Sequence, residues 1–197
     1  MKTNIRTIHF YGDSLTSGYG AAYNDSWIPH LSRRFPTLSL YNHGQCGAGL
    51  SEILAEASAA ACHPSSGEVF FLMGGTNDIL SGRRYASLLS EASREIQSLS
   101  ASISLILGIP ILATRASITA GWQAAWQYGK NNEELTAYAE FLRRLAESLS
   151  LPVLDFQKAL PLDDAFYTDG LHPNAKGYER FAETAAQWIE TQIDPSV

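Results

Sequence analysis

Short apolar runs alternate with longer amphipathic stretches along the whole chain, and this alternation restricts the fold more than any other feature. Five runs are rich in β-forming residues, and three are nearly all apolar: Ile5–Tyr11, Leu38–Asn42, Val69–Met73, Ile109–Thr114 and Pro152–Asp155. Strands this apolar are typical of a parallel sheet covered on both faces. No internal repeat, low-complexity tract or Pro/Ser-rich linker interrupts the alternation, so we expect one domain over residues 1–197.

Helices are expected between these strands. The candidates are Trp27–Phe35, Leu50–Cys62, Tyr85–Leu107, Asn132–Leu149 and Asn174–Ile193. The fourth shows the apolar stripe of a helix most plainly, and Asn131 or Asn132 is its expected N-cap. Strands and helices in this order predict an open α/β sheet with right-handed crossovers and helices on both faces. Ligands of such sheets bind beyond the carboxyl ends of the strands, so the residues that follow each strand are the candidates for chemistry.

The charge balance and the short apolar runs exclude several classes of partner. Fourteen Lys and Arg against twenty Asp and Glu give a net charge of −6, which does not favour nucleic acid. Runs such as Val69–Met73 are too short to span a bilayer, and Met1–Thr7 shows no signal stretch, so we expect a cytoplasmic protein without a membrane span. The two cysteines, Cys46 and Cys62, form neither a disulfide framework nor a zinc motif.

Gly12, Asp13 and Ser14 directly follow the first expected strand. Gly12 permits a sharp exit from the strand, which places the Ser14 hydroxyl near the start of the next helical turn and facing the ligand crevice. Two other interpretations stay open for this motif in isolation. Asp13 or Ser14 caps a turn, or the glycine and hydroxyls bind a phosphate or a flavin, as in flavodoxin-like proteins.

Two glycine-rich segments follow the second and third strands. The first reads NHGQCGAG and offers Gly44, Gly47 and Gly49, whose N–H groups can approach a ligand closely. Its G-x-x-G-x-G order is not the dinucleotide fingerprint. The second reads GGTND, and Asn77 can donate its amide N–H into the crevice. Donors of both kinds stabilise oxyanions, although each segment alone is also typical of a turn or a helix cap.

A carboxylate and an imidazole stand three residues apart in the segment DGLHPN, where Pro173 suits the first turn of the last helix. If Asp169 accepts the Nδ1–H of His172, Nε2 is left as a base, as a hydrolytic triad requires. A surface histidine beside a helix start is the alternative. Strand-end carboxylates with a histidine also hold metal in phosphoesterases, and Asp13, Asp78, Asp169 and His172 are the candidate ligands, although this spacing supplies few of them.

Together, the four motifs resemble those of the SGNH-hydrolase family, the GDSL esterases and lipases, in their order and over nearly the whole chain. The first block corresponds to GDSL at Gly12–Leu15, and the G-x-S-x-G elbow found in the middle of α/β-hydrolase sequences is absent. The resemblance implies five site residues, with these roles: nucleophile Ser14, backbone oxyanion donor Gly47 with Gly44 as the fallback, side-chain oxyanion donor Asn77, and the remaining triad members Asp169 and His172.

The resemblance also implies a flavodoxin-like three-layer fold with strand order 2-1-3-4-5, and hydrolysis of a small-molecule ester without metal or organic cofactor. Family members act on lipids, thioesters, carbohydrates and aryl esters, so lysophospholipase and acyl-thioesterase activities stay open. No long apolar lid is visible, which favours short acyl groups such as acetyl. We expect three aromatic residues near the crevice: Trp122, Trp126 and Tyr128. They stack on a sugar or an aryl group or wall an acyl pocket, or else Trp122 and Trp126 pack a short helix. The oligomeric state stays open.

Overall fold

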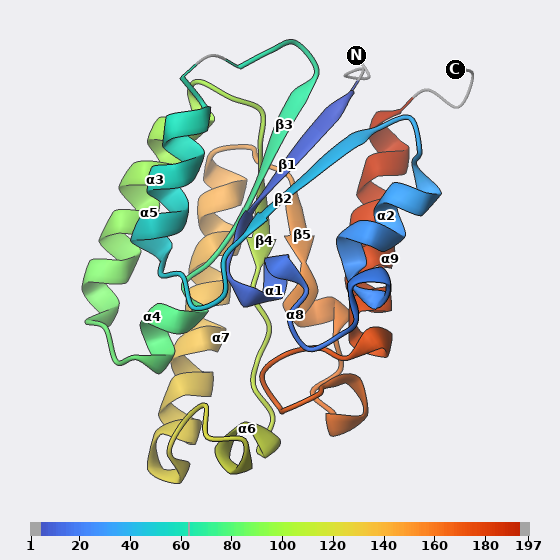
Figure 1. Cartoon of the computed structure of the whole chain (residues 1–197). Helices are drawn as coiled ribbons and strands as arrows, with labels where there is room; N and C mark the ends of the chain where they lie inside the picture. The colour runs from blue at the N-terminus through green and yellow to red at the C-terminus, as the bar shows by residue number, and fades with distance from the viewer. Residues whose placement is uncertain (1–4, 63, 194–197) are drawn as a thin grey trace.

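The computed structural model describes residues 5–62 and 64–193, and its centre is a parallel sheet between two layers of helices (Figure 1). Its strands are β1 (Thr7–Gly12), β2 (Ser39–Gly44), β3 (Glu68–Met73), β4 (Leu105–Ile109) and β5 (Val153–Asp155). They lie in the order β2-β1-β3-β4-β5, and all neighbours pair in parallel. This confirms the predicted three-layer α/β fold with strand order 2-1-3-4-5.

Helices cover both faces of the sheet. Figure 1 shows α3 (Leu50–Ala60), α5 (Tyr85–Ser100) and α7 (Ala125–Ser148) on one side, with α2 (Trp27–Arg34) and α9 (Ala175–Gln192) on the other. Four short helices lie toward the end where the strands finish: α1 (Ser14–Ser17), α4 (Thr76–Leu80), α6 (Ala116–Thr119) and α8 (Phe156–Ala159). Gly12 pairs with Gly44 on one side and with Met73 on the other, so β1, β2 and β3 end at the same level.

Alternate residues of β3 face the two helical layers. Phe71 packs edge to face against Trp27 of α2, with ring centroids 5.5 Å apart, whereas Phe70 and Leu72 belong to the cluster beneath α3, α5 and α7. Burial on both faces explains why β3 is apolar at nearly every position. Within the described part of the chain, no helix is both long enough and apolar enough to span a bilayer.

The fourth strand lies earlier than the sequence analysis predicts. The helix expected over Tyr85–Leu107 ends at Ser100. The strand expected over Ile109–Thr114 instead covers Leu105–Ile109, so the two ranges share Ile109 alone. Pro110 has no N–H to donate, so it does not continue the ladder after β4. The prediction was wrong because the apolar run across this region does not reveal by periodicity where a helix ends and a strand begins.

The N-terminus of α7 is also earlier than expected. The helix begins at Ala125, so Asn131 and Asn132 lie inside it and neither caps it. The N-cap is Ala124, whose backbone N–H donates to the side-chain oxygen of Gln127 at 3.1 Å. Asparagine serves equally as a cap and as a partner for neighbouring loops, and the local sequence does not separate these two uses.

Candidate active site

All five residues predicted to form the site lie at the carboxyl end of the sheet. Ser14 begins α1 directly after β1, Gly47 lies between β2 and α3, and Asn77 belongs to α4 after β3. Asp169 and His172 lie in the loop that leads into α9. All but Asp169 line one cavity of about 570 Å³, and Asp169 is hydrogen-bonded to His172.

A chain of hydrogen bonds joins the serine, the histidine and the aspartate. Ser14 Oγ lies 3.0 Å from His172 Nε2, and His172 Nδ1 lies 2.8 Å from Asp169 Oδ2. Ser14 is 8% exposed and His172 is 2% exposed, so bulk water competes little for these contacts. An imidazole that donates its Nδ1–H to Asp169 presents the lone pair of Nε2 to the serine. This arrangement is suited to removing the hydroxyl proton of Ser14.

Hydrogen bonds hold Asp169 in its charged form. Partial burial acts to raise the pKa of this carboxyl group, but the backbone and ring of His172 and the backbone N–H of Leu171 outweigh it, so the pKa lies below its ordinary value. Asp169 Oδ1 accepts the N–H groups of Leu171 and His172 at 3.0 and 2.8 Å. A carboxylate fixed in this way can stabilise a positive charge on the neighbouring imidazole.

The local fold separates the roles of Asp13 and Ser14. Asp13 is the N-cap of α1, and its Oδ1 accepts the N–H of Leu15 at 2.9 Å. Among the described residues, nothing accepts a hydrogen bond from the backbone N–H of Ser14. Gly12 is required just before them because a Cβ there would lie 2.0 Å from Thr16 Oγ1. The cap is therefore Asp13, and both the hydroxyl and the N–H of Ser14 are available at the cavity.

The two candidate oxyanion glycines have different surroundings. The N–H of Gly44 donates to Asn42 Oδ1 at 2.9 Å, and a Cβ on Gly44 would lie 2.2 Å from the backbone nitrogen of Ser17. Gly47 lines the cavity with a φ of +82°, and its N–H has no partner in residues 5–62 or 64–193. Close packing explains the glycine at position 44, and the left-handed backbone explains the one at position 47.

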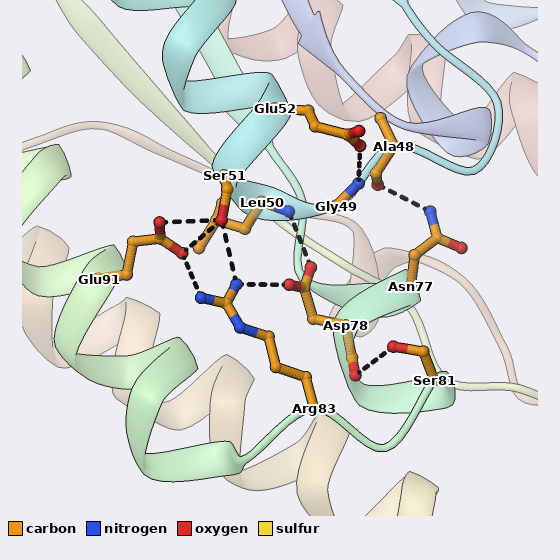
Figure 2. A network of polar contacts seen from close by, with 10 residues as sticks. All are labelled: Ala48, Gly49, Leu50, Ser51, Glu52, Asn77, Asp78, Ser81, Arg83 and Glu91. Carbon is orange, nitrogen blue, oxygen red and sulfur yellow. Dashed lines mark hydrogen bonds and ion pairs between the residues drawn. The ribbon is translucent and has the colours of Figure 1, made fainter.

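Asn77 is tied to the loop that carries Gly47. Its Nδ2 donates to the carbonyl oxygen of Ala48 at 2.9 Å, as Figure 2 shows. An amide nitrogen carries two N–H groups, so the second is available to a ligand. The neighbouring Gly49 donates its backbone N–H to Glu52 at 2.8 Å, which caps α3.

Asp78 holds the second and third glycine-rich segments together. Its Oδ2 accepts the N–H of Leu50 at 2.8 Å, and its Oδ1 pairs with Arg83 at 2.6 Å. Arg83 in turn pairs with Glu91 of α5 at 2.8 Å (Figure 2). The Asp78 side chain is 5% exposed, so this is a largely buried ion pair. Asp78 therefore accepts a hydrogen bond from the first turn of α3, which lies earlier in the chain, and does not cap the next helix. This contact also fixes the neighbouring Asn77 relative to the loop that carries Gly47.

Two aromatic residues complete the surroundings of His172. The rings of Tyr19 and Trp122 contact the imidazole edge to face, with centroids 4.6 and 4.9 Å away. Trp122 belongs to the segment that the sequence analysis singled out, but it lies between α6 and α7 rather than on one helix with Trp126. Trp126 is 80% exposed. No sequence signal pointed to Tyr19, because its contact depends on the loop after α1 folding back onto the loop before α9.

The acidic residues of the site are spread over separate loops. In the part of the chain that the structure describes, no group of three or more His, Cys, Asp or Glu side chains is arranged to hold a metal ion. Of the four ligands considered from the sequence, Asp78 pairs with Arg83, while Asp169 pairs with His172.

The buried carboxyl group of Asp13 is expected to make the stability of the fold depend on pH. It is 1% exposed, its Oδ2 has no hydrogen-bond partner among the described residues, and burial is the main reason that its pKa is raised to about 7. Unfolded chains release this proton near pH 4, so the contribution of Asp13 to stability is full below about pH 4 and is lost as the pH rises to about 7. In Asp13→Asn, thermal unfolding should no longer show this loss, so the variant gains stability relative to wild type between about pH 4 and pH 8.

Asp163→Asn is the matched control, because Asp163 is also a capping aspartate, with its Oδ1 accepting the N–H of Ala165 at 2.9 Å, but it is exposed. Its stability relative to wild type should show no such gain over this range. Parallel pH profiles for wild type and Asp13→Asn would contradict the assignment of a buried neutral carboxyl group.

Comparisons with known proteins point to one family. A model described as "GDSL-like Lipase/Acylhydrolase family" matches residues 10–180. The fold is similar to that of a lipolytic G-D-S-L family protein from Veillonella parvula, at 23% identity over 92% of this chain and 97% of that chain, with a TM-score of 0.78. No curated protein matches the chain.

Two further solved structures share the fold. One is the psychrotrophic esterase EstA from Pseudoalteromonas sp., in a structure inhibited by monoethylphosphonate, at 16% identity over 94% of this chain and 97% of that chain, with a TM-score of 0.70. The other is a carbohydrate acetylesterase family member from Sinorhizobium meliloti, at 16% identity over 96% of this chain and 99% of that chain, with a TM-score of 0.73.

Proposed function

The chain belongs to the GDSL-like lipase/acylhydrolase family, and from this premise we propose that it is a serine esterase that hydrolyses carboxylic esters with short acyl groups such as acetyl. The observation that carries the proposal is the 3.0 Å contact between Ser14 Oγ and His172 Nε2, continued at 2.8 Å to Asp169. The family supports hydrolysis, and the site supplies a serine nucleophile with its base.

In the proposed reaction, His172 Nε2 takes the proton of Ser14 Oγ as this oxygen attacks the ester carbonyl carbon. The tetrahedral intermediate collapses as His172 returns the proton to the departing alcohol, which leaves an acyl group on Ser14. Water then attacks the acyl carbonyl carbon while His172 Nε2 takes one of its protons. The bond between this carbon and Ser14 Oγ breaks as His172 returns the proton to Ser14 Oγ, which releases the acid and regenerates the serine. Throughout, Asp169 stabilises the imidazolium that forms in each step.

The negative oxygen of the intermediate is assigned three donors: the backbone N–H groups of Ser14 and Gly47 and the side-chain amide of Asn77. Support comes from the free N–H groups of Ser14 and Gly47 among the described residues and from the second amide N–H of Asn77. Gly44 is less suited because its N–H is already bonded to Asn42. Fixed donors aimed at a developing charge are among the largest contributions to catalysis.

The names of two structural neighbours agree with ester hydrolysis. One is an esterase whose structure is inhibited by monoethylphosphonate, and the other belongs to a carbohydrate acetylesterase family. The cavity of about 570 Å³ has the size of a small-molecule site, and its apolar lining consists of Tyr19, Leu80, Trp122 and Leu171. This apolar lining is small, which supports a short acyl group.

Hydrolysis of p-nitrophenyl esters from acetate to palmitate tests this function. We expect kcat/KM to be greatest for the shortest acyl groups and to fall by about tenfold or more toward palmitate, because the few apolar side chains that line the cavity offer a palmitoyl chain little surface to pack against. EDTA should leave the rate unchanged. A maximum at long chains would instead favour a lysophospholipase or a long-chain acyl-thioesterase, and loss of activity in EDTA would favour a metal-dependent phosphoesterase. A yellow protein without esterase activity would favour a flavin-binding module.

A further inference from the structure

Asp169 receives a hydrogen bond from outside its own loop. The indole Nε1–H of Trp122 donates to Asp169 Oδ2 at 2.8 Å, and the same oxygen accepts the Nδ1–H of His172. The second carboxylate oxygen accepts backbone N–H groups of Leu171 and His172. Among the described residues, the other donors to Asp169 belong to Leu171 and His172 of its own loop, and the indole of Trp122 is the one donor from a different segment.

A buried chain of polar side chains fixes the loop that carries Trp122. Asn131 Nδ2 donates to Gln123 Oε1, and Gln123 Nε2 donates to Ser117 Oγ, each at 2.8 Å. All three residues are buried, with exposures of 6% or less. The backbone N–H of Trp122 donates to the carbonyl oxygen of Ser117 at 3.0 Å. Breaking a satisfied buried network is costly, so the fold itself holds the indole against Asp169.

The loop of Asp169 is tied to the same region from its other side. The N–H of Thr114 donates to the carbonyl oxygen of Gly170 at 2.7 Å, and a Cβ on Gly170 would lie 2.1 Å from the backbone nitrogen of Ser117. Ser117 thus contacts the backbone of both loops. The hydrogen bond between Trp122 and Asp169 therefore joins two segments that already have a fixed relative position.

The indole ring also contacts the imidazole. Its centroid lies 4.9 Å from that of His172 at an interplanar angle of 76°, and Tyr19 contacts the same imidazole at 4.6 Å and 64°. Both rings limit rotation of the imidazole away from the line between Ser14 and Asp169. Trp122 remains 41% exposed and lines the cavity.

We propose that Trp122 is a positioning residue of the catalytic triad, whose indole N–H aligns the Asp169 carboxylate with His172 and takes up part of its negative charge. This inference rests on the proposed esterase function, in which His172 is the base. Charge taken up by the indole is not available to stabilise a protonated imidazole. Trp122 therefore keeps the base neutral, and the enzyme active, to a lower pH than Asp169 would without it.

Other titratable groups also face this region, and of these Tyr19 contacts the Trp122 ring edge to face, with centroids 6.4 Å apart. The loop after α1 contributes Tyr19, whose carbonyl oxygen accepts the hydroxyl of Tyr178 from α9 at 2.7 Å. Asp13 at the start of α1 and Cys46 from the loop after β2 act electrostatically on Tyr178, as does Asp169. The indole N–H donates to Asp169 and to none of these other groups, so a substitution that keeps an aromatic ring at position 122 reports the lost indole hydrogen bond.

Trp122→Phe tests the proposal, because phenylalanine keeps an aromatic ring beside His172 but has no N–H. We expect the acid limb of kcat/KM for p-nitrophenyl acetate to move upward by about half a pH unit. At the alkaline plateau we expect kcat to fall by about three- to tenfold with little change in KM, because Asp169 is less well held. Trp126→Phe is the control, since Trp126 is in the same region but 80% exposed, and its profile should match wild type.

Coincident acid limbs for Trp122→Phe and wild type would overturn the proposal, as would a rise in KM alone, which would assign Trp122 to the cavity wall. An inactive wild-type protein would instead overturn the proposed function. A second measurement needs no Trp122 variant: nuclear magnetic resonance of ¹⁵N-tryptophan-labelled wild type reports the indole N–H signals of the chain's four tryptophans. One signal should titrate together with the acid limb of kcat/KM, and four signals that do not titrate there would also contradict the proposal.

Discussion

Replacing Ser14 by alanine is expected to lower the hydrolysis of p-nitrophenyl acetate by about 10⁴- to 10⁶-fold. The hydroxyl that we propose to form the acyl intermediate is then absent, and the His172 Nε2 that lies 3.0 Å from it has no serine proton to remove. Folding should be little affected, because the cap of α1 is Asp13 and not Ser14. Steady-state rates and thermal unfolding of the purified variant check both statements.

Ser17→Ala is the matched control for this substitution. Ser17 belongs to the same short helix, and its hydroxyl donates to the carbonyl oxygen of Ser14 at 2.9 Å, but its side chain does not line the cavity. This variant should keep most of the activity. If Ser14→Ala also kept most of its activity, the nucleophile would have to be another group.

Replacing Asn77 by alanine should lower kcat by about 10²- to 10³-fold with little change in KM. The side-chain amide is assigned to the oxyanion, which exists in the transition state and not in the bound substrate, so its loss affects turnover more than binding. Steady-state kinetics at the pH optimum measure this split.

The substitution at position 77 also removes the hydrogen bond to the carbonyl oxygen of Ala48. That bond accounts for about 1 kcal/mol of stability, and thermal unfolding measures its loss separately from turnover. If KM instead rose by about 10²- to 10³-fold while kcat stayed unchanged, Asn77 would bind the substrate and would not stabilise the oxyanion.

The fold could be predicted from the sequence because burial on both faces leaves a distinct pattern in the strands. Phe70 and Phe71 face opposite helical layers, so β3 is apolar throughout and is easily recognised. The end of β4 could not be predicted from hydrophobicity, because the residues after the strand are as apolar as the strand itself. There, the chain leaves the sheet at Pro110 because of a missing N–H, and not because of any change in hydrophobicity.

The location of the candidate site residues at one edge of the sheet could be predicted because each follows the end of a strand or precedes the last helix. Parallel strands end at the same edge of the sheet, and this rule alone was enough to place Ser14, Asn77 and His172 there. The contacts that hold them were not predictable in this way. Asp78 and Leu50 are 28 residues apart, and Trp122 and Asp169 are 47 residues apart. Each pair joins two segments that are far apart in the sequence, and no periodicity relates one partner to the other.

The measurement that bears most directly on the proposed nucleophile is the intact mass and peptide map of the purified protein after treatment with a fluorophosphonate. We expect one adduct per chain, located on Ser14, with loss of esterase activity in proportion to labelling and no adduct in Ser14→Ala. A protein that hydrolyses esters but takes up no phosphonyl group, or takes it up on another residue, would contradict the assignment of Ser14 and His172 as nucleophile and base.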